Sequence, residues 1–328
     1  MTKKIEAQLQ ANIMLIEINN PDRLNSINTE MVADLTSLLK SAESVNDCKM
    51  IIIYGRGSKS FCAGGDIKEL YSFISNYDFE KAMNFFNSEY TMDLLIHNCS
   101  KPTIVIGDGI TMGGGMGIAQ GADIICVTEN TEMAMPETRI GFFPDVGATY
   151  WLNKKLKGGM PLYMGLTGAS LKSGQCVAAE LADYLIDSTM TFELLFQLQQ
   201  ATNDFTDQRD ENLKIIKKHI RHLIQNPSDD VDAIQRIADT HFTSDKSFDE
   251  IFISLETSGE TEILNILKSR SPYALSLAHK LIVNGQNISI EDAFKQELNA
   301  AEKTIQFPDY KEGIRARIID KDEPSWHN

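Results

Sequence analysis

The order of hydrophobic and polar residues predicts a series of strands in the first half of the chain. Residues from Ile5 to Gln10 alternate between apolar and polar, which is typical of a strand with one face in solvent. The runs Ile13–Ile18 and Met50–Tyr54 are almost wholly apolar, as in strands that are covered on both faces. We therefore expect these runs to lie in the interior of a sheet.

Helices are predicted between and after these strands. Apolar residues recur at helical spacing from Met31, and Asn28 or Thr29 is placed to cap the helix. A second helix is expected from Phe79 to His97. Further along, the pattern predicts a strand, a helix that opens on glycine, and another strand, at Pro102–Ile106, Gly113–Ala119 and Ile124–Val127. This alternation predicts a layered α/β domain with parallel strands.

After about Thr189 the pattern changes to amphipathic helices. They are predicted at 192–199, 210–224 and 248–268, with polar loops between them. We therefore predict two regions. Residues 1–188 form an α/β core that contains the active site, and residues 189–328 form a mostly helical region that packs on the core.

Composition excludes several classes of protein. A net charge of −15 argues against a nucleic-acid-binding surface, which needs clustered Lys and Arg. The five cysteines include no CxxC pair, so neither a disulfide framework nor a cysteine zinc site is expected. No stretch has the length of a membrane span, and the first residues show neither a signal-peptide nor a transit-peptide pattern. These features favour a cytoplasmic protein with no membrane partner.

Two glycine-rich loops stand out as candidate binding elements. The first, Ser60–Lys68, contains Gly64 and Gly65 and precedes a helix that is expected to begin near Asp66. Its residues suit either an ordinary strand-to-helix turn or backbone N–H groups that face an anion. The second, Gly107–Gly117, has three consecutive glycines but lacks the spacing of a dinucleotide or P-loop motif. The second loop therefore suits either close backbone packing or a site with backbone N–H donors.

An acidic pair lies in an apolar stretch between Met133 and Gly147. Glu137 and Asp145 are flanked by Met, Ile, Phe, Pro and Gly, and apolar surroundings raise the pKa of a carboxyl toward neutral. The alternative is a surface pair of Glu137 with Arg139, and a turn or helix cap at Asp145. Neither a metal-binding histidine motif nor a GxSxG nucleophile motif accompanies this pair.

Taken together, the three stretches resemble the crotonase (enoyl-CoA hydratase/isomerase) superfamily. Phe61–Lys68 is similar to that family's first oxyanion loop, and Gly109–Gly117 is similar to its second. The resemblance implies a spiral of ββα units, with the backbone N–H groups of Gly65 and Gly114 binding a thioester carbonyl. The flanking residues that it places at the substrate are Gly64, Asp66 and Gly113.

The acidic residues indicate a branch of this superfamily. Enoyl-CoA hydratases have one glutamate just past the glycine run and another in a Pro-Glu pair; here these positions are Gly117 and Glu137. The stretch Met135–Gly147 is instead similar to the 3-hydroxyisobutyryl-CoA hydrolases. Two further segments resemble that branch, namely Phe85–Tyr90 with its substrate-site glutamate Glu89, and the tail Asp309–Trp326.

The resemblance implies an acyl-CoA thioester hydrolase of valine breakdown, acting on 3-hydroxyisobutyryl-CoA or 3-hydroxypropionyl-CoA. Glu137 is expected to activate water or to attack the thioester directly, and Asp145 to bind the 3-hydroxyl group or to relay protons. CoA arrives with the substrate, so no separate cofactor and no metal are expected. Arg23 and Lys68 are candidates for its phosphates, or ordinary surface charges. The resemblance implies a homo-oligomer, with the alternative that the helical C-terminal region covers the surface that other members use for assembly. An enoyl-CoA hydratase or isomerase and a non-catalytic acyl-CoA-binding protein are the alternatives.

Overall fold

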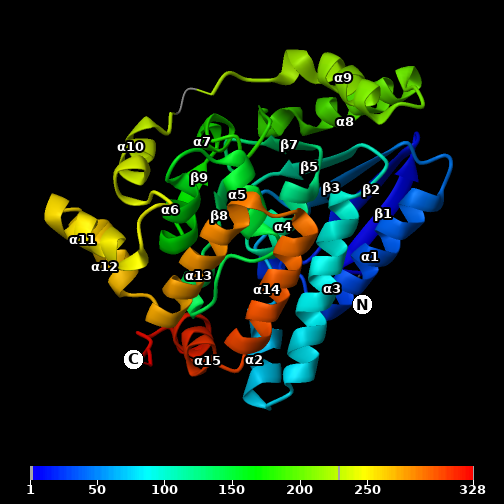
Figure 1. Ribbon diagram of the computed structural model, residues 1–328. Helices are drawn as coiled ribbons and strands as arrows, with labels where there is room; N and C mark the ends of the chain where they lie inside the picture. The colour runs from blue at the N-terminus through cyan, green and yellow to red at the C-terminus, as the bar shows by residue number, and fades with distance from the viewer. Residues whose placement is uncertain (1–2, 228–229, 328) are drawn as a thin grey trace. The chain divides into compact units, whose positions relative to one another are not determined.

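The computed structural model describes residues 3–227 and 230–327, which form two compact units (Figure 1). Unit 1 comprises Met1–Gly65, Thr91–Met133 and Leu171–Asp230, and unit 2 comprises Asp66–Tyr90, Ala134–Ser170 and Val231–Asn328. Each unit is discontinuous in sequence. The units therefore do not test a single linear boundary such as the one predicted between residues 188 and 189, which stays a prediction.

A six-stranded sheet forms the centre of unit 1. Its strand order is β1-β2-β3-β5-β7-β10; β1 and β2 are antiparallel, and every other pair is parallel. The bounds are β1 (Ile5–Gln10), β2 (Ile13–Ile18), β3 (Met50–Gly55), β5 (Thr103–Gly107), β7 (Ile124–Val127) and β10 (Tyr184–Leu185). The predicted strands and their parallel pairing are confirmed.

Two helices cover one face of this sheet. Isoleucines of β2, β3, β5 and β7 pack in a single buried cluster with Leu194 and Leu198 of α8 (Thr191–Ala201) and with Ile216 and Ile220 of α9 (Arg209–Ile220). Figure 1 shows α8 and α9 lying along these strands. Ile16, Ile51 and Ile53, whose side chains point to the opposite face, are buried as well. Both faces of these apolar runs are therefore removed from water, which explains why apolar residues follow one another there.

The remaining elements of unit 1 are short, apart from its first helix. That helix begins after Asn28, whose side chain accepts a hydrogen bond from the Met31 N–H, so Asn28 is its cap. The elements are η1 (Pro21–Arg23), α1 (Thr29–Ser44), α4 (Gly114–Gly121), α7 (Gly174–Ala178), η3 (Ser188–Met190), η4 (Thr202–Asp204) and η5 (Arg221–Leu223).

A second, four-stranded sheet has the order β4-β6-β8-β9, with β4 and β6 parallel. Its strands are β4 (Ser60–Cys62), β6 (Ile110–Met112), β8 (Glu132–Ala134) and β9 (Ser170–Lys172). Since β4 and β6 each run into one of the glycine loops, their parallel pairing brings the two loops to the same edge of the sheet.

Unit 2 is mostly helical. It contains the first part of α3 (Phe79–His97), whose remainder belongs to unit 1. Its other elements are α2 (Ile67–Ser75), η2 (Glu137–Ile140), α5 (Ala148–Lys155), α6 (Met160–Thr167), α10 (Asp232–His241), α11 (Phe248–Ser258), α12 (Thr261–Lys268), α13 (Pro272–Asn284), η6 (Gly285–Asn287), α14 (Ile290–Thr304), α15 (Pro308–Ile314) and the π-helical turn η7 (Arg315–Asp320).

The prediction of a single helix at 248–268 is wrong, because the helix is interrupted within this segment. Gly259 has a positive φ of 78° and ends α11, and its N–H donates to the carbonyls of Glu256 and Leu255. Glycine adopts this left-handed conformation without a steric penalty, so an apolar pattern that continues on both sides does not keep the helix intact. The segment predicted at 210–224 likewise ends its α-helix at Ile220.

Among the residues that the structure describes, no helix is long and apolar enough to cross a membrane. All five cysteines are buried and free.

Candidate active site

The two glycine loops of unit 1 touch each other through their backbones. Gly64 has a φ of +99°, and a Cβ atom there would lie 3.0 Å from the Met112 carbonyl oxygen and 3.2 Å from the Gly114 nitrogen. A Cβ atom at Gly115 would lie 2.1 Å from the Cys62 carbonyl oxygen. The glycines are therefore required for close packing, one of the two alternatives drawn from the sequence.

The same loops also present backbone donors. Gly114 is the first residue of α4, and its N–H is one of those that a helix leaves without an intrahelical partner. Within residues 3–227 and 230–327, no backbone carbonyl outside regular helices and strands accepts a hydrogen bond from the Gly65 or the Gly114 N–H. The Gly113 residue that precedes α4 has a φ of 52° and contributes no side-chain cap. Asp66 has a local role, since its Oδ1 caps α2 by accepting from the Lys68 and Glu69 N–H groups.

In unit 2, Glu137 begins a short 3₁₀ turn that the C-terminal helix α15 holds. A Cβ atom at Gly141 would lie 2.5 Å from the Asp309 carbonyl oxygen, and one at Gly313 would lie 2.3 Å from the Ile140 carbonyl oxygen. The turn and α15 are thus in backbone contact. This contact gives the resemblance noted for the tail a physical basis, because the tail supports the turn that contains Glu137.

Asp145 follows this turn and meets α3. The Tyr90 hydroxyl donates a hydrogen bond of 2.7 Å to Asp145 Oδ2. Glu89 precedes Tyr90 on the same helix and is only 3% exposed; Asp145 is 6% and Glu137 9% exposed. One oxygen each of Glu89 and Glu137 is buried without a hydrogen-bond partner among the described residues.

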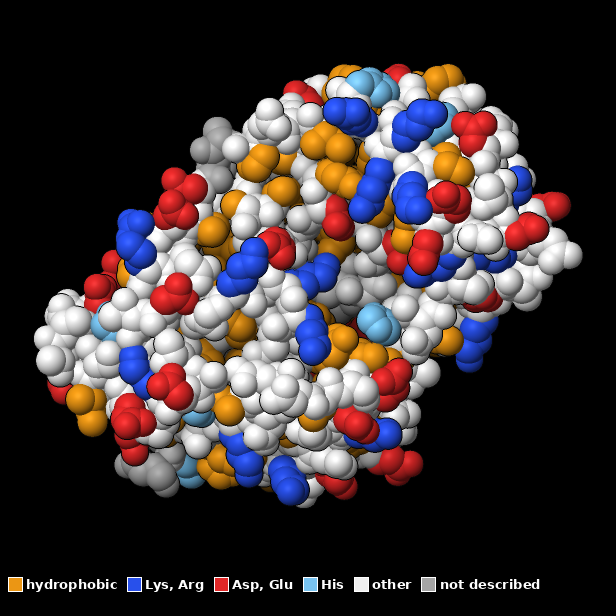
Figure 2. Space-filling model, turned by 45° about the horizontal axis from the view of Figure 1, so that its top comes forward, with side chains coloured by type: hydrophobic (Ala, Val, Ile, Leu, Met, Phe, Trp, Pro, Cys, Tyr) orange, Lys and Arg blue, Asp and Glu red, His pale blue; other side chains and the backbone are white. Residues whose placement is uncertain are grey.

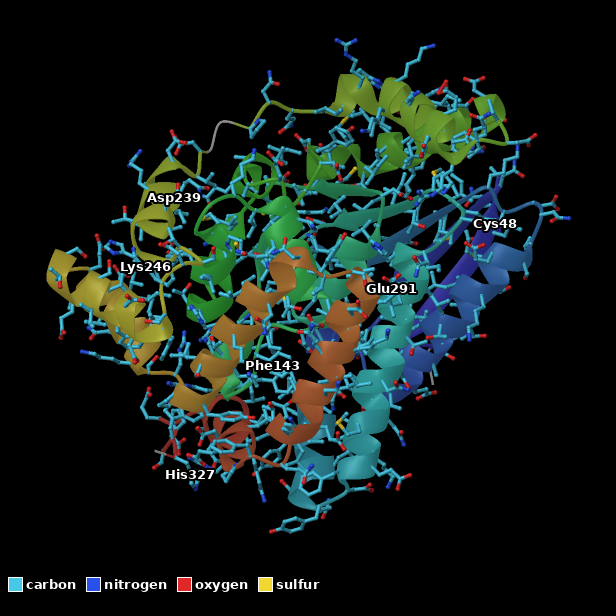
Figure 3. All side chains as sticks on the ribbon, in the orientation of Figure 1. Cys48, Phe143, Asp239, Lys246, Glu291 and His327 are labelled. Carbon is cyan, nitrogen blue, oxygen red and sulfur yellow. The ribbon has the colours of Figure 1, made fainter. Side chains whose placement is uncertain are left out.

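Aromatic side chains provide the apolar surroundings of these carboxyls. Phe142 stacks on Phe86 and on Phe143, with ring centroids 5.3 and 4.4 Å apart, and its ring lies 4.7 Å from that of Tyr310. Phe143 is labelled in Figure 3. Low-polarity surroundings disfavour the ionised form of a carboxyl.

Burial accordingly raises the pKa of each carboxyl. Burial raises the pKa of Asp145 to about 7, against the opposing effect of the Tyr90 hydrogen bond. The pKa of Glu137 and that of Glu89 lie well above the usual value, first through burial and then through the nearby Asp145 charge. A carboxyl that titrates near neutral pH is suited to exchange protons with a substrate or a water molecule.

The structure bears on the simpler alternatives for each acid. Glu137 is buried and so forms no surface pair with Arg139. The cap of α5 is Gly147, not the Asp145 side chain. Glu89 does not lie on a solvated helix face. The chemical roles of these residues stay predictions, as do those of Gly64, Gly65, Asp66, Gly113 and Gly114.

A further buried carboxyl near these acids, Glu297, is not among the residues predicted from the sequence. It lies on α14 with Ala293, Phe294, Ala300 and Ala301, all buried. A glutamate in the apolar stripe of an amphipathic helix is the signal that would have revealed it, because such a position excludes water.

No metal centre accompanies these groups. In the described part of the chain, no cluster of three or more His, Cys, Asp or Glu side chains is arranged to bind a metal ion. The His219 side chain instead contacts Asp204 at 3.0 Å, on the surface. Arg23 and Lys68, the candidates for phosphate contacts, are exposed. Acidic and basic side chains are interspersed on the face shown in Figure 2.

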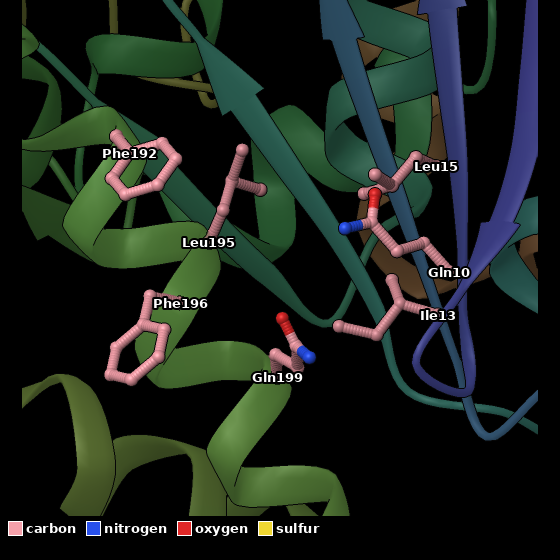
Figure 4. A pocket seen from close by; sticks show the side chains of 7 residues that line it. All are labelled: Gln10, Ile13, Leu15, Phe192, Leu195, Phe196 and Gln199. Carbon is pink, nitrogen blue, oxygen red and sulfur yellow. The ribbon is translucent and has the colours of Figure 1, made fainter.

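An apolar pocket of about 170 Å³ lies elsewhere in unit 1, beside α8 (Figure 4). Its lining residues are Gln10, Ile13, Leu15, Phe192, Leu195, Phe196 and Gln199. None of them is a predicted site residue, so we assign this pocket no part in the chemistry proposed below.

Comparison with known proteins gives relatives of two kinds. The chain is 32% identical to the mitochondrial 3-hydroxyisobutyryl-CoA hydrolase of Gallus gallus, over 97% of this chain and 83% of the relative. It is also 32% identical to the small ribosomal subunit protein mS47 of Neurospora crassa, over 94% of this chain and 64% of the relative. The chain is thus similar in sequence both to a relative named as an enzyme and to a relative named as a ribosomal protein.

The expectation of a cytoplasmic protein is contradicted by these comparisons, since the hydrolases of chicken, Xenopus laevis and human are all named as mitochondrial. That expectation was wrong because free cysteines do not distinguish the cytoplasm from another reducing compartment.

The fold and the family are shown by two further matches. A solved enoyl-CoA hydratase of Rhodobacter sphaeroides superposes with a TM-score of 0.88 at 28% identity, covering 99% of this chain and 93% of that one. The predicted crotonase-like α/β fold with a mostly helical C-terminal region is confirmed. Residues 13–328 match the enoyl-CoA hydratase/isomerase family. The matched residues include both glycine loops and the buried acids. The chain therefore belongs to the enoyl-CoA hydratase/isomerase family.

Proposed function

We propose that this protein is an acyl-CoA thioester hydrolase that converts 3-hydroxyisobutyryl-CoA and water to 3-hydroxyisobutyrate and CoA, a step of valine breakdown. The observation that carries the proposal is the buried pair of Glu137 and Asp145, together with Gly117 where a hydratase has its other glutamate. Relatives named as 3-hydroxyisobutyryl-CoA hydrolases, at about 30% identity over most of the chain, support it.

Hydrolysis of a thioester needs donors for the oxyanion that forms when the carbonyl is attacked. The Gly65 and Gly114 N–H groups are proposed for this task, because backbone donors at a glycine loop are already oriented before the reaction. Removing one such donor from an oxyanion site typically raises the barrier by about 2.7–4 kcal/mol. Gly64 and Gly113 hold the two loops in contact.

Glu137 is proposed as the group that acts on water or on the thioester carbon. Its raised pKa gives it the basicity to accept a proton from water. As a nucleophile it would instead form an acyl-enzyme anhydride that water then cleaves. Asp145 is proposed to accept a hydrogen bond from the 3-hydroxyl group, and Glu89 to contact the acyl group.

No metal or redox cofactor is proposed, since CoA enters as part of the substrate. We propose Arg23 and Lys68 as contacts for its phosphates, and a homo-oligomer as the assembled form.

Two other functions follow from particular observations. The solved hydratase at 28% identity favours an enoyl-CoA hydratase or isomerase, but addition of water across a double bond uses two acids and the first position here is Gly117. The ribosomal relative favours a non-catalytic role. The presence of Glu137 and Asp145 in a buried cluster argues against that role. Burying a carboxyl lowers the stability of the folded protein, and a non-catalytic protein gains nothing in return.

A substrate panel distinguishes the three functions. Release of CoA is followed with a chromogenic thiol reagent from 3-hydroxyisobutyryl-CoA, 3-hydroxypropionyl-CoA and isobutyryl-CoA, and loss of ultraviolet absorbance is followed with crotonyl-CoA. The proposal predicts rapid thiol release from the hydroxylated thioesters and much slower release from isobutyryl-CoA, because Asp145 then lacks its partner. Loss of enoyl absorbance without thiol release favours the hydratase, and no reaction with any of the four thioesters contradicts both the hydrolase and the hydratase.

A further inference from the structure

The turn that contains Asp145 is strained. Val146 has a φ of 53° and Gly147 a φ of 79°. A β-branched residue rarely adopts positive φ, because its side chain then clashes with its own backbone. Such a conformation persists only where the surrounding structure enforces it, and it is often found next to functional groups.

Glu297 supplies that constraint from α14. Its Oε2 accepts a hydrogen bond of 2.7 Å from the Gly147 N–H. Its Oε1 accepts from the Thr149 N–H at 3.0 Å and from the Thr149 hydroxyl at 2.5 Å. The carboxyl is completely buried, so both of its oxygens are occupied by the segment that follows Asp145.

Two further contacts hold the same turn. The Trp151 indole N–H donates to the Val146 carbonyl oxygen at 3.2 Å. A Cβ atom at Gly147 would lie 3.0 Å from Phe294, one turn before Glu297 on the same helix. The helix α14 therefore packs against the turn with an apolar and a polar contact side by side.

We propose that Glu297 is a positioning residue, which holds the strained Asp145–Gly147 turn so that the Asp145 carboxyl meets Tyr90. Glu297 does not react itself, because its oxygens are engaged by three donors. This role rests on the proposed function, since it concerns the geometry of a proposed catalytic group.

Glu297 and the other buried acids raise one another's pKa values. Burial, and after it the Asp145 charge, raise the pKa of Glu297 to about 8, against the hydrogen bonds from Thr149 and Gly147. The Glu297 charge in turn raises the pKa of Glu137. The titratable groups that face this cluster from the packed elements are Glu89 and Tyr90 on α3, Glu137 on η2, Asp145 before α5 and Tyr310 on α15.

The test compares Glu297→Gln with Glu302→Gln, an exposed glutamate near the end of the same helix. The kcat and KM for 3-hydroxyisobutyryl-CoA are measured across pH 5–9. We expect Glu297→Gln to lower kcat at least tenfold with KM changed less than threefold, because the Asp145–Gly147 turn is then no longer held in place. Glu302→Gln leaves both unchanged.

A rescue experiment separates positioning from general damage. In the Glu297→Gln variant, Val146→Gly removes the strain at residue 146, because glycine adopts a positive φ freely. We expect the kcat of the double variant to be at least threefold higher than that of Glu297→Gln alone. If Glu297→Gln is poorly folded by circular dichroism, Thr149→Val replaces it, since this change removes only the hydroxyl donor. An unchanged kcat in a folded variant, or a loss of kcat that Val146→Gly does not restore at all, overturns the proposal.

Hydrogen exchange distinguishes failure of this role from failure of the proposed function. If the native protein releases no thiol, the proposed function fails, and the Glu297 contact is judged from amide exchange in residues 145–152. Faster exchange of Gly147 and Thr149 in Glu297→Gln, but not in Glu302→Gln, supports the holding role. Equal exchange in both variants contradicts it.

Discussion

The three candidate acids of the site are among the carboxyl side chains of unit 2 that are almost completely removed from water. Glu89, Glu137 and Asp145 are each less than one tenth exposed, and aromatic rings line their surroundings. Their raised pKa values follow from this burial rather than from any single hydrogen bond. Because each ionised carboxyl disfavours ionisation of the next, the group exchanges protons as a unit, and its apparent pKa values belong to the set.

Tyr90 controls one member of this set. The hydrogen bond from Tyr90 to Asp145 Oδ2 favours the ionised carboxylate, and Tyr90→Phe removes this bond. We expect the pKa of Asp145 to rise by about one unit, as the loss of a hydrogen bond to a charged group implies. Carboxyl carbon NMR titration of the native protein and the variant measures it.

Tyr77→Phe is the control, because the Tyr77 side chain is 77% exposed. A pKa of Asp145 that stays the same or falls in Tyr90→Phe contradicts the assignment of this hydrogen bond.

The sequence indicated most of these residues but not their partners. Glu137 and Asp145 were selected because apolar neighbours surround them in the chain, and Glu89 because of the family resemblance. Tyr90 and Glu297 act through tertiary contacts that join α3 and α14 to a turn far away in sequence. No local pattern records such contacts, although the position of Glu297 in an apolar stripe is unusual.

At the scale of elements, parallel pairing of β4 with β6 is what places the glycine loops together. The two strands are fifty residues apart, and each is followed by a loop and a helix. Their backbone contact leaves no room for a side chain at Gly115. The loop sequence is thus set by packing and by donor geometry at once.

Gly115→Ala tests this contact. Its Cβ atom would meet the Cys62 carbonyl oxygen at 2.1 Å, so the loop must move, which costs roughly 1–3 kcal/mol of stability or more. We expect a lower melting temperature and a loss of thiol release greater than tenfold, since the Gly114 donor moves with the loop.

Gly107→Ala is the matched control, because its Cβ atom would have ordinary contacts no closer than 3.6 Å. Thermal unfolding and initial rates of both variants decide the matter. Equal behaviour of the two variants contradicts the account of the loop contact.

Elements of the sheet were easier to predict than those of the helical region. The apolar runs of β2, β3 and β7 are only four to six residues long and lie between turn residues, which favours strands over helices. The helical pattern at 248–268 continues across Gly259, so periodicity alone missed the break. Burial of α8 and α9 on the sheet of unit 1 depends on contacts between distant segments.

At the scale of the molecule, the buried acids make stability depend on pH. The pKa of Asp145 is raised from 3.8 to about 7, and that of Glu297 from 4.5 to about 8. At a pH between its unfolded-state and folded-state pKa, each carboxyl binds more protons in the folded state than in the unfolded state. The contribution of these two carboxyls to the free energy of unfolding therefore decreases as pH rises. It is fully present below about pH 4 and is lost by about pH 8.

Asp145→Asn isolates the effect, because asparagine cannot ionise and still accepts from Tyr90. Urea unfolding at pH 5, 6.5 and 8 is the measurement. We expect the variant to gain stability relative to the native protein as pH rises, by a few kcal/mol at most at pH 8. His241 and His279, whose pKa values are lowered by burial, act in the opposite direction but equally in both proteins. A constant difference across pH contradicts the raised pKa of Asp145.

The fold class was predictable from the strand and helix pattern and the family resemblance, whereas the division into two units was not. Each unit combines segments from three parts of the chain, so a change of composition near residue 189 does not reveal it. Localisation was likewise beyond the sequence signals used, as the mitochondrial relatives show.

The most direct test of the central claim is the kcat for CoA release from 3-hydroxyisobutyryl-CoA by the native protein, by Glu137→Gln and by Glu132→Gln. Glu132 is a partly exposed glutamate five residues earlier, and its replacement controls for the change of charge. We predict rapid release by the native protein and by Glu132→Gln, and a loss of about 10²–10⁴-fold in Glu137→Gln. Equal kcat values for Glu137→Gln and Glu132→Gln, or no release by the native protein, contradict the hydrolase and the role of its buried acid.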